Sequence, residues 1–119
     1  MDFRLEEMDK LSSALPKPVG WKLLLLMPAK SEKVGTIIMP DSVQEIEKQG
    51  SMCAYVLDVG AEAYTDQNRY STPWCKKGDY VIIKAFEGTR FEIGGRELRL
   101  INEDTVQAVV PQPQEIKRL

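Results

Sequence analysis

The sequence predicts a small all-β domain, an irregular barrel of short strands with one long loop and an N-terminal extension. The chain has 119 residues, fewer than the roughly 150 typical of one domain. Hydrophobic residues make up 43% of it, enough for a single packed core. Short β-rich runs alternate with glycine- and proline-containing turns, and little of the chain has helical periodicity. We expect a domain over residues 18–110, preceded by an extension (1–17) and followed by a polar tail (111–119).

The extension is predicted to contain a short helix. Its apolar residues recur at spacings of three and four, as on one face of a helix. They are Leu5, Met8, Leu11 and Leu15. Pro16 and Pro18 would end this helix. Two interpretations remain: a frayed terminal helix, which the pattern favours, or an element that docks on another subunit.

The predicted strands follow. They span residues 21–27, 52–59, 80–86, 91–93, 96–101 and 105–110. The first is apolar at most positions, which indicates a strand buried on both faces. The second would place Cys53, Tyr55, Leu57 and Val59 on one face. Gly94 and Gly95 separate two β-rich runs and predict a hairpin with a two-residue turn.

The composition excludes several classes of function. The chain has no histidine, which removes His-based acid–base catalysis and His-ligated metal. Its two cysteines, Cys53 and Cys75, cannot complete a four-ligand zinc site. We therefore expect no cofactor, no metal and no enzymatic activity. A reduced cysteine pair is the plainest interpretation, and a disulfide stays open.

Charge and hydropathy narrow the choice of partners. The net charge is −2 and the pI is about 5.2, which disfavours nucleic-acid binding. The longest apolar run, residues 23–27, is far shorter than a membrane span. The N-terminus is acidic and lacks the apolar stretch of a secretory signal. A soluble, cytoplasmic protein is predicted.

Residues 29–50 do not fit a compact domain. Loops beyond about 12–15 residues are usually functional or disordered. The apolar residues Ile37, Ile38 and Met39 stand at the centre of this one, between Gly35 and Pro40. They predict either a short core strand, which the pattern alone modestly favours, or a recognition segment that orders on a partner.

Short motifs in the same order and spacing resemble the bacterial co-chaperonin GroES family (chaperonin-10). They are residues 35–42, 56–60, 77–81, 87–98 and 102–109. The resemblance extends over about residues 18–110. It implies a heptameric ring that caps a GroEL-type chaperonin, which binds the ATP, and that closes a chamber for unfolded client proteins.

The resemblance also assigns binding residues. The mobile loop of the family, with its apolar tripeptide, corresponds to Gly35, Thr36, Ile37, Ile38 and Met39. The first and last strands of the family pair between neighbouring subunits. Here these are residues 17–22 and 106–110, and the implied interface residues are Val19, Trp21, Val106, Ala108 and Val110.

The chain departs from the family pattern at several positions. Thr36 replaces a second loop glycine, and Met39 replaces the usual leucine. Residues 61–73 lack the turn glycine of a roof-like hairpin, so we do not predict that hairpin. Residues 1–17 have no counterpart in the family. Such divergence would suit a viral or otherwise specialised member, acting in the host cytoplasm if viral.

Other interpretations remain open. The chain could be an all-β structural or assembly module. Residues 77–81 also resemble a strand of the zinc-type alcohol dehydrogenase barrel, but the chain has neither histidine ligands nor room for a dinucleotide domain. A single-strand nucleic-acid binder would use the strand aromatics Tyr55, Tyr80, Phe86 and Phe91, which the charge balance opposes.

Overall fold

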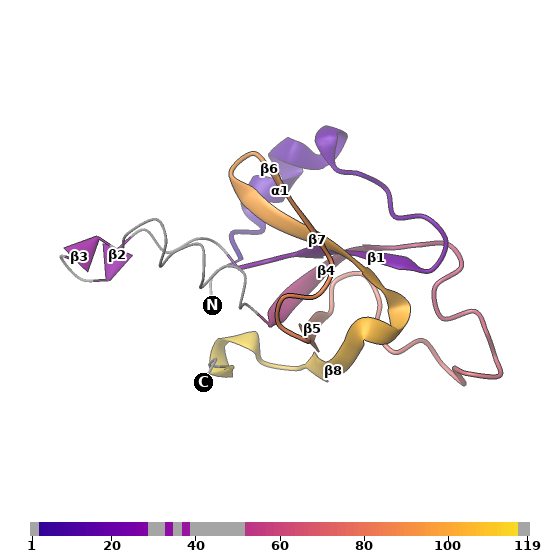
Figure 1. Ribbon diagram of the computed structural model, residues 1–119. Coiled ribbons are helices and arrows are strands. Elements are labelled where there is room, and N and C mark those ends of the chain that lie inside the picture. The colour runs from indigo at the N-terminus through magenta and orange to yellow at the C-terminus, as the bar shows by residue number, and fades with distance from the viewer. Residues whose placement is uncertain (1–2, 29–32, 35–36, 39–51, 117–119) are drawn as a thin grey trace.

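The computed structural model describes residues 3–28, 33–34, 37–38 and 52–116 (Figure 1). The α-helix is α1 (Glu6–Leu11). The strands are β1 (Lys22–Leu26), β2 (Lys33–Val34), β3 (Ile37–Ile38), β4 (Cys53–Val59), β5 (Tyr80–Ile83), β6 (Thr89–Ile93), β7 (Arg96–Asn102) and β8 (Val106–Val110). Short 3-10 helices span Ser12–Ala14, Glu103–Thr105 and Pro113–Glu115.

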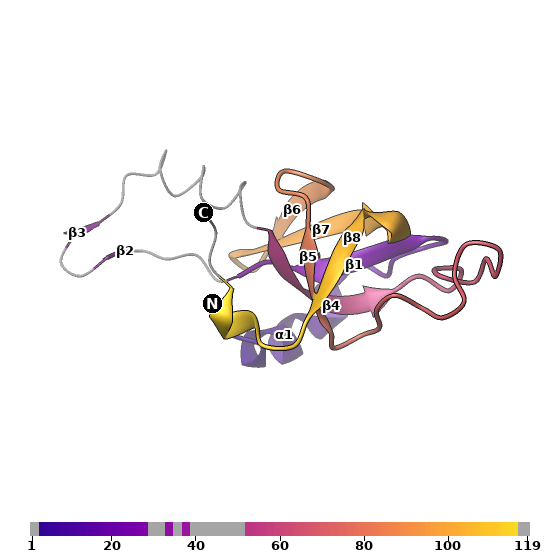
Figure 2. The same ribbon diagram turned by 90° about the horizontal axis from the view of Figure 1, so that it is seen from below.

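The strands form two separate antiparallel sheets. The larger has six strands in the order β6-β7-β1-β4-β5-β8, and the smaller pairs β2 with β3. The two views in Figures 1 and 2 both place the β2–β3 pair away from the six-stranded sheet. The prediction of a small all-β fold is confirmed.

Both faces of β1 are buried, as its continuous apolar sequence predicts. Leu23 and Leu25 point to one face of the sheet, and Leu24 and Leu26 point to the other. We call the two resulting groups the inner and outer clusters. The inner cluster comprises Leu23, Leu25, Met27, Ala54, Val56, Tyr64, Tyr70, Cys75, Val81, Ile83, Ile101 and Val106. The outer cluster comprises Phe3, Met8, Leu24, Leu26, Cys53, Leu98 and Val110.

A β-bulge in β4 corrects the predicted faces of this strand. Leu24 pairs with Asp58 and Leu25 pairs with Val56, so Leu57 is the extra residue. An inserted residue reverses the alternation beyond it. Val59 therefore packs on the inner cluster, whereas Tyr55 packs on the outer cluster. The prediction that they share a face is wrong.

The strand predicted to end at Phe86 is shorter than expected. β5 ends at Ile83, and a turn follows in which the N–H of Glu87 donates to the carbonyl of Lys84. Phe86 has a φ of 70° and is 60% exposed. Phe86 therefore lies in a turn outside the sheet, and its side chain is largely exposed.

The predicted hairpin is present. Gly94 and Gly95 join β6 to β7 with φ values of 58° and 80°. Both angles are in the left-handed region that a two-residue turn of this kind needs and that glycine adopts without strain. A Cβ atom on Gly94 would lie 2.8 Å from the Leu11 side chain. The hairpin turn is therefore in direct contact with the N-terminal extension.

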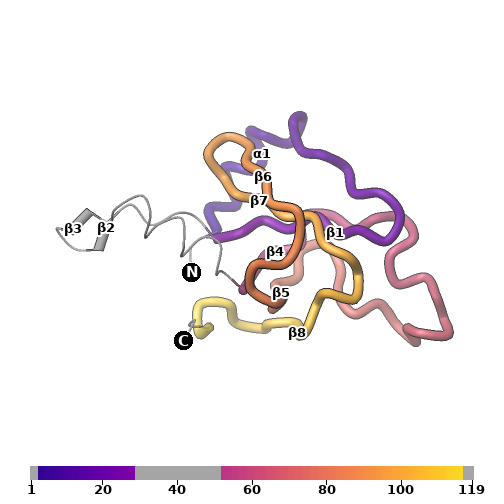
Figure 3. The backbone as a smooth tube through the Cα atoms, viewed as in Figure 1, coloured from indigo at the N-terminus to yellow at the C-terminus, as the bar shows by residue number. Residues whose placement is uncertain are grey.

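The extension is an integral part of the fold. Met8 is buried in the outer cluster, and Leu5, Leu11 and Leu15 pack against it. A short α-helix is present, but it ends at Leu11, before the prolines that were expected to end it, and a 3-10 turn follows. The apolar residues of the extension pack on a face of the sheet that would otherwise be exposed. Figure 3 also shows that residues 60–79, between β4 and β5, extend to one end of the molecule. We call these residues the 60–79 excursion.

Candidate functional site

The structure assigns part of the predicted partner-binding segment to β3. Ile37 pairs with Val34, and Ile38 pairs with Lys33. Gly35, Thr36 and Met39 lie outside the described residues. Because β3 belongs to the separate two-stranded sheet, it is not a strand of the six-stranded core.

The strands on either side of this segment are fixed in the sheet. At the end of β1, the N–H of Met27 donates to the carbonyl of Glu97 at 3.0 Å. Before β4, the carbonyl of Met52 accepts from the N–H of Ile83 at 2.8 Å. The segment between them therefore begins and ends at defined points of the core.

The predicted interface segment before β1 is exposed and locally held. Val19 is 74% exposed and Trp21 is 57% exposed. The carbonyl of Gly20 accepts a hydrogen bond from Glu62 N–H, at 3.0 Å. A Cβ atom on Gly60 would lie 2.4 Å from that carbonyl oxygen. Only glycine at position 60 allows this close approach of the two backbones.

The other predicted interface element, β8, is an edge strand with a bulge. Ile82 pairs with Ala108 and Ile83 pairs with Val106. The extra residue, Gln107, sends Val106 to the inner cluster and Val110 to the outer cluster. Of the predicted residues on β8, only Ala108 is exposed. The interface assignment stays a prediction, and it would depend on the outer backbone edge of β8.

Sequence reasoning missed two exposed apolar residues beside this edge. Val109 is exposed, and Trp74 of the 60–79 excursion lies nearby. With residues 106–108 they line a pocket of about 230 Å³. No sequence signal identified them, because the bulge changes the alternation and residue 74 is distant along the chain.

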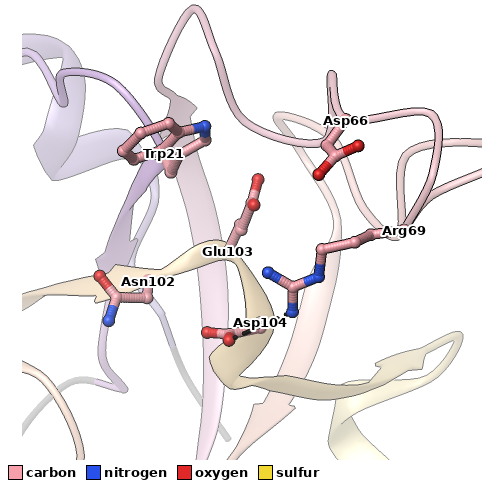
Figure 4. Close-up of a pocket in the computed structure, with 6 residues that line it drawn as sticks. All are labelled: Trp21, Asp66, Arg69, Asn102, Glu103 and Asp104. Atoms are coloured by element: carbon pink, nitrogen blue, oxygen red, sulfur yellow. Dashed lines mark ion pairs between the residues drawn. The ribbon is translucent and has the colours of Figure 1, made fainter.

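A polar pocket of about 370 Å³ lies beside Trp21 (Figure 4). It is lined by Trp21, Asp66, Arg69, Asn102, Glu103 and Asp104. The charged groups are already engaged within the chain: Arg69 pairs with Asp104 at 3.5 Å, and the Glu103 carboxylate accepts from the N–H of Tyr64 at 2.6 Å. Within the described ranges, no group of three or more metal-ligating side chains could hold an ion.

An aromatic cluster occupies the 60–79 excursion. The rings of Tyr64 and Tyr70 are 5.1 Å apart, and Tyr70 and Trp74 are 4.9 Å apart. The Tyr64 hydroxyl donates to the carbonyl of Glu103 at 2.7 Å. All residues from 61 to 73 are described, and they form turns and bends without a strand. The excursion is therefore held by Tyr64 and Tyr70, which belong to the inner cluster.

Both cysteines are buried free thiols. Burial raises the pKa of the Cys53 thiol and of the Cys75 thiol. A raised pKa lowers the thiolate fraction at neutral pH, and the thiolate is the nucleophile. The pair is therefore reduced here, and burial disfavours the reactive thiolate form of both side chains.

No helix in the described part of the chain is long and apolar enough to cross a membrane.

Comparisons with known proteins agree on one family. The model of the chaperonin 10 Kd subunit family matches residues 17–110. A co-chaperonin GroES of an Exiguobacterium species is 30% identical over 95 residues, which cover 79% of this chain and 97% of the relative. The co-chaperonin GroES of Pelagibacter ubique is 31% identical over 94 residues, covering 78% of this chain and 94% of that protein.

A third relative, the co-chaperonin GroES of Caldicellulosiruptor saccharolyticus, is 30% identical over 79% of this chain and 95% of its own length. The match covers the six-stranded sheet and the segment between β1 and β4, and it leaves α1 outside. The family consists of co-chaperonins and not of enzymes, in agreement with the sequence prediction. The chain belongs to the chaperonin 10 Kd subunit family, that of the GroES co-chaperonins.

Proposed function

We propose that this protein is a co-chaperonin that forms a ring-shaped lid on a GroEL-type chaperonin in the cytoplasm. It would bind its partner through Ile37, Ile38 and Met39. The observation that carries the proposal is the position of β3, which pairs with β2 and not with the six-stranded sheet. Family membership supports the choice of partner, and the partner would bind and hydrolyse the ATP.

The size of the segment suits weak, reversible contacts. Burying one large aliphatic side chain is worth roughly 1.5–3 kcal/mol, so three would contribute about 5–9 kcal/mol. Ordering the backbone costs on the order of 1–2 kcal/mol per residue, which offsets most of this gain. A single segment therefore binds weakly, and several in one ring bind tightly through a high effective concentration.

The ring would form by pairing β8 with residues 17–22 of a neighbouring subunit. Two observations support this arrangement. β8 is an edge strand of the six-stranded sheet, and an unpaired strand edge is a ready template for another chain. Val19 and Trp21 are the apolar, exposed residues that such a contact would cover. Seven copies are expected from the family.

The experiment compares Ile38→Asp with the conservative Ile38→Val. Each variant is incubated with a GroEL-type chaperonin and nucleotide, and capped ends are counted by negative-stain microscopy. We expect Ile38→Asp to abolish capping, because a carboxylate cannot be buried in an apolar groove without a partner. Ile38→Val should cap like wild type. Unchanged capping by a folded Ile38→Asp ring would refute the assignment.

A further inference from the structure

Arg96 connects the N-terminal extension to the end of β1. Its side chain is 5% exposed. The guanidinium donates to the carbonyl of Phe3, to the carbonyl of Arg4 at 3.3 Å and to the carboxylate of Glu7 at 3.2 Å. It also donates to the carbonyl of Met27 at 3.3 Å. One buried cation thus joins the extension to the residue that follows β1.

The same extension belongs to the buried cluster that contains the start of β4. Phe3 and Met8 share the outer cluster with Leu26, the last residue of β1, and with Cys53, the first residue of β4. Leu26 and Cys53 are completely buried. The last residue of β1 and the first residue of β4 therefore belong to the same buried cluster as the extension.

The extension is itself firmly held. The ring of Phe3 meets that of Tyr80 edge-on, with centroids 5.1 Å apart. Arg4 has a φ of 46°, a left-handed conformation that is unfavourable for a non-glycine residue. Such strain persists only where surrounding contacts impose it, and here it aims the Arg4 carbonyl at Arg96. The family match begins at residue 17, so these contacts are an addition to the family fold.

We propose that residues 3–15 act as a brace for the chaperonin-binding segment, with Arg96 and Glu7 as positioning residues. The brace holds the two strand ends from which that segment departs, and this limits the directions that the segment can take. Restricting the unbound ensemble lowers the entropy lost on binding. This inference rests on the proposed function, because it assumes that the segment binds a chaperonin.

The test uses full-length rings of Glu7→Ala and Arg96→Met. Glu6→Ala is the matched control, because Glu6 is an exposed carboxylate of the same helical turn. Ile101→Val controls for stability, since Ile101 is a buried inner-cluster residue. Chaperonin affinity is measured by calorimetry at a temperature where every variant is folded. Amide exchange at Met27 and Cys53 reports on the strand ends.

We expect faster exchange at Met27 and Cys53 in Glu7→Ala, with chaperonin affinity reduced by about threefold to tenfold. Arg96→Met should lose more affinity, and Glu6→Ala and Ile101→Val should bind like wild type. If Arg96→Met does not fold, the affinity and amide exchange of Glu7→Ala alone test the brace. Wild-type affinity in Glu7→Ala, or an equal loss in Ile101→Val, would overturn the brace.

The result for Ile38→Asp separates the two proposals. If Ile38→Asp loses binding while Glu7→Ala does not, the brace fails and the proposed function stands. If Ile38→Asp binds like wild type, the proposed function fails. In that case amide exchange is the only remaining test of the brace. Unchanged exchange at Met27 and Cys53 in Glu7→Ala would overturn it.

Discussion

The N-terminal extension and the β2–β3 pair both lie outside the six-stranded sheet, and they relate to it in opposite ways. The brace, residues 3–15, buries Phe3 and Met8 against the sheet. Strands β2 and β3 pair with each other in a sheet of their own. Both segments contain large apolar residues, so apolar content alone does not decide whether a segment joins the core. What differs is that the brace packs on the outer cluster, whereas β3 pairs with β2 in a separate sheet.

The largest expected difference between the two segments is in amide exchange. Protection ranges from almost none in segments without tertiary contacts to the full free energy of unfolding in the core. We expect the amide of Met8 to exchange at least about 100-fold more slowly than those of β2 and β3 in the free protein. Hydrogen-exchange mass spectrometry would measure this.

Chaperonin binding should slow amide exchange in β3 and leave the exchange rate of the Met8 amide unchanged. Strong protection of β3 in the free ring would contradict the distinction between the two segments.

Matched aspartates should affect stability unequally. Met8→Asp places a carboxylate in a site that is 6% exposed, and we expect it to lower the free energy of unfolding by about 4 kcal/mol or more. Ile38→Asp should change it by no more than about 0.5 kcal/mol, the range of surface substitutions. Urea unfolding of both variants measures the difference, and equal destabilisation would place β3 in the core.

A smaller effect tests the contact between the brace and the β6–β7 turn. Gly94→Ala and Gly95→Ala both force alanine into positive φ, at a cost of about 1 kcal/mol. Only at Gly94 does the new Cβ also meet the Leu11 side chain. Gly94→Ala should therefore be less stable than Gly95→Ala by roughly 0.5–1 kcal/mol. Equal unfolding midpoints would show that α1 does not rest on this turn.

The mildest perturbation is alkaline pH, which weakens both clusters, because burial raises the pKa of Cys53 in the outer cluster as well as that of buried groups in the inner cluster. Burial raises the pKa of Cys75 and of Tyr64 above their ordinary values. The folded state then holds these protons more tightly than the unfolded state, so stability is full below about pH 9 and falls as the pH rises further. Tyr64→Phe should lessen this fall above about pH 10 in urea-unfolding series. An identical slope would contradict the shifted pKa.

Local sequence predicted the features that depend on neighbouring residues. The four leucines of β1, residues 23–26, predicted a strand buried on both faces, and Gly94 and Gly95 predicted the hairpin turn. The alternation of short β-rich runs with glycine- and proline-containing turns predicted the all-β fold. These signals need no knowledge of distant contacts.

Features that depend on distant contacts were not predictable. The bulges at Leu57 and Gln107 reverse the alternation of their strands, and a two-residue period cannot reveal an extra residue. Arg96 was not recognised as a buried connector, because its partners Phe3 and Glu7 lie at the other end of the sequence. The predicted binding residues on β3 were identified by family resemblance, since Ile37 and Ile38 would also suit a core strand.

The outer edge of β8 has a consequence for assembly size. Pairing it with residues 17–22 of the next copy would join two unlike surfaces, head to tail. An open series of copies would then keep one free surface of each kind, one at each end, until the two ends meet. Whether such a series closes or extends as a filament depends on the rotation between successive copies. In the proposed ring β8 would set this rotation, and the bulge at Gln107 bends that strand. One inserted residue would then influence how many copies close the ring.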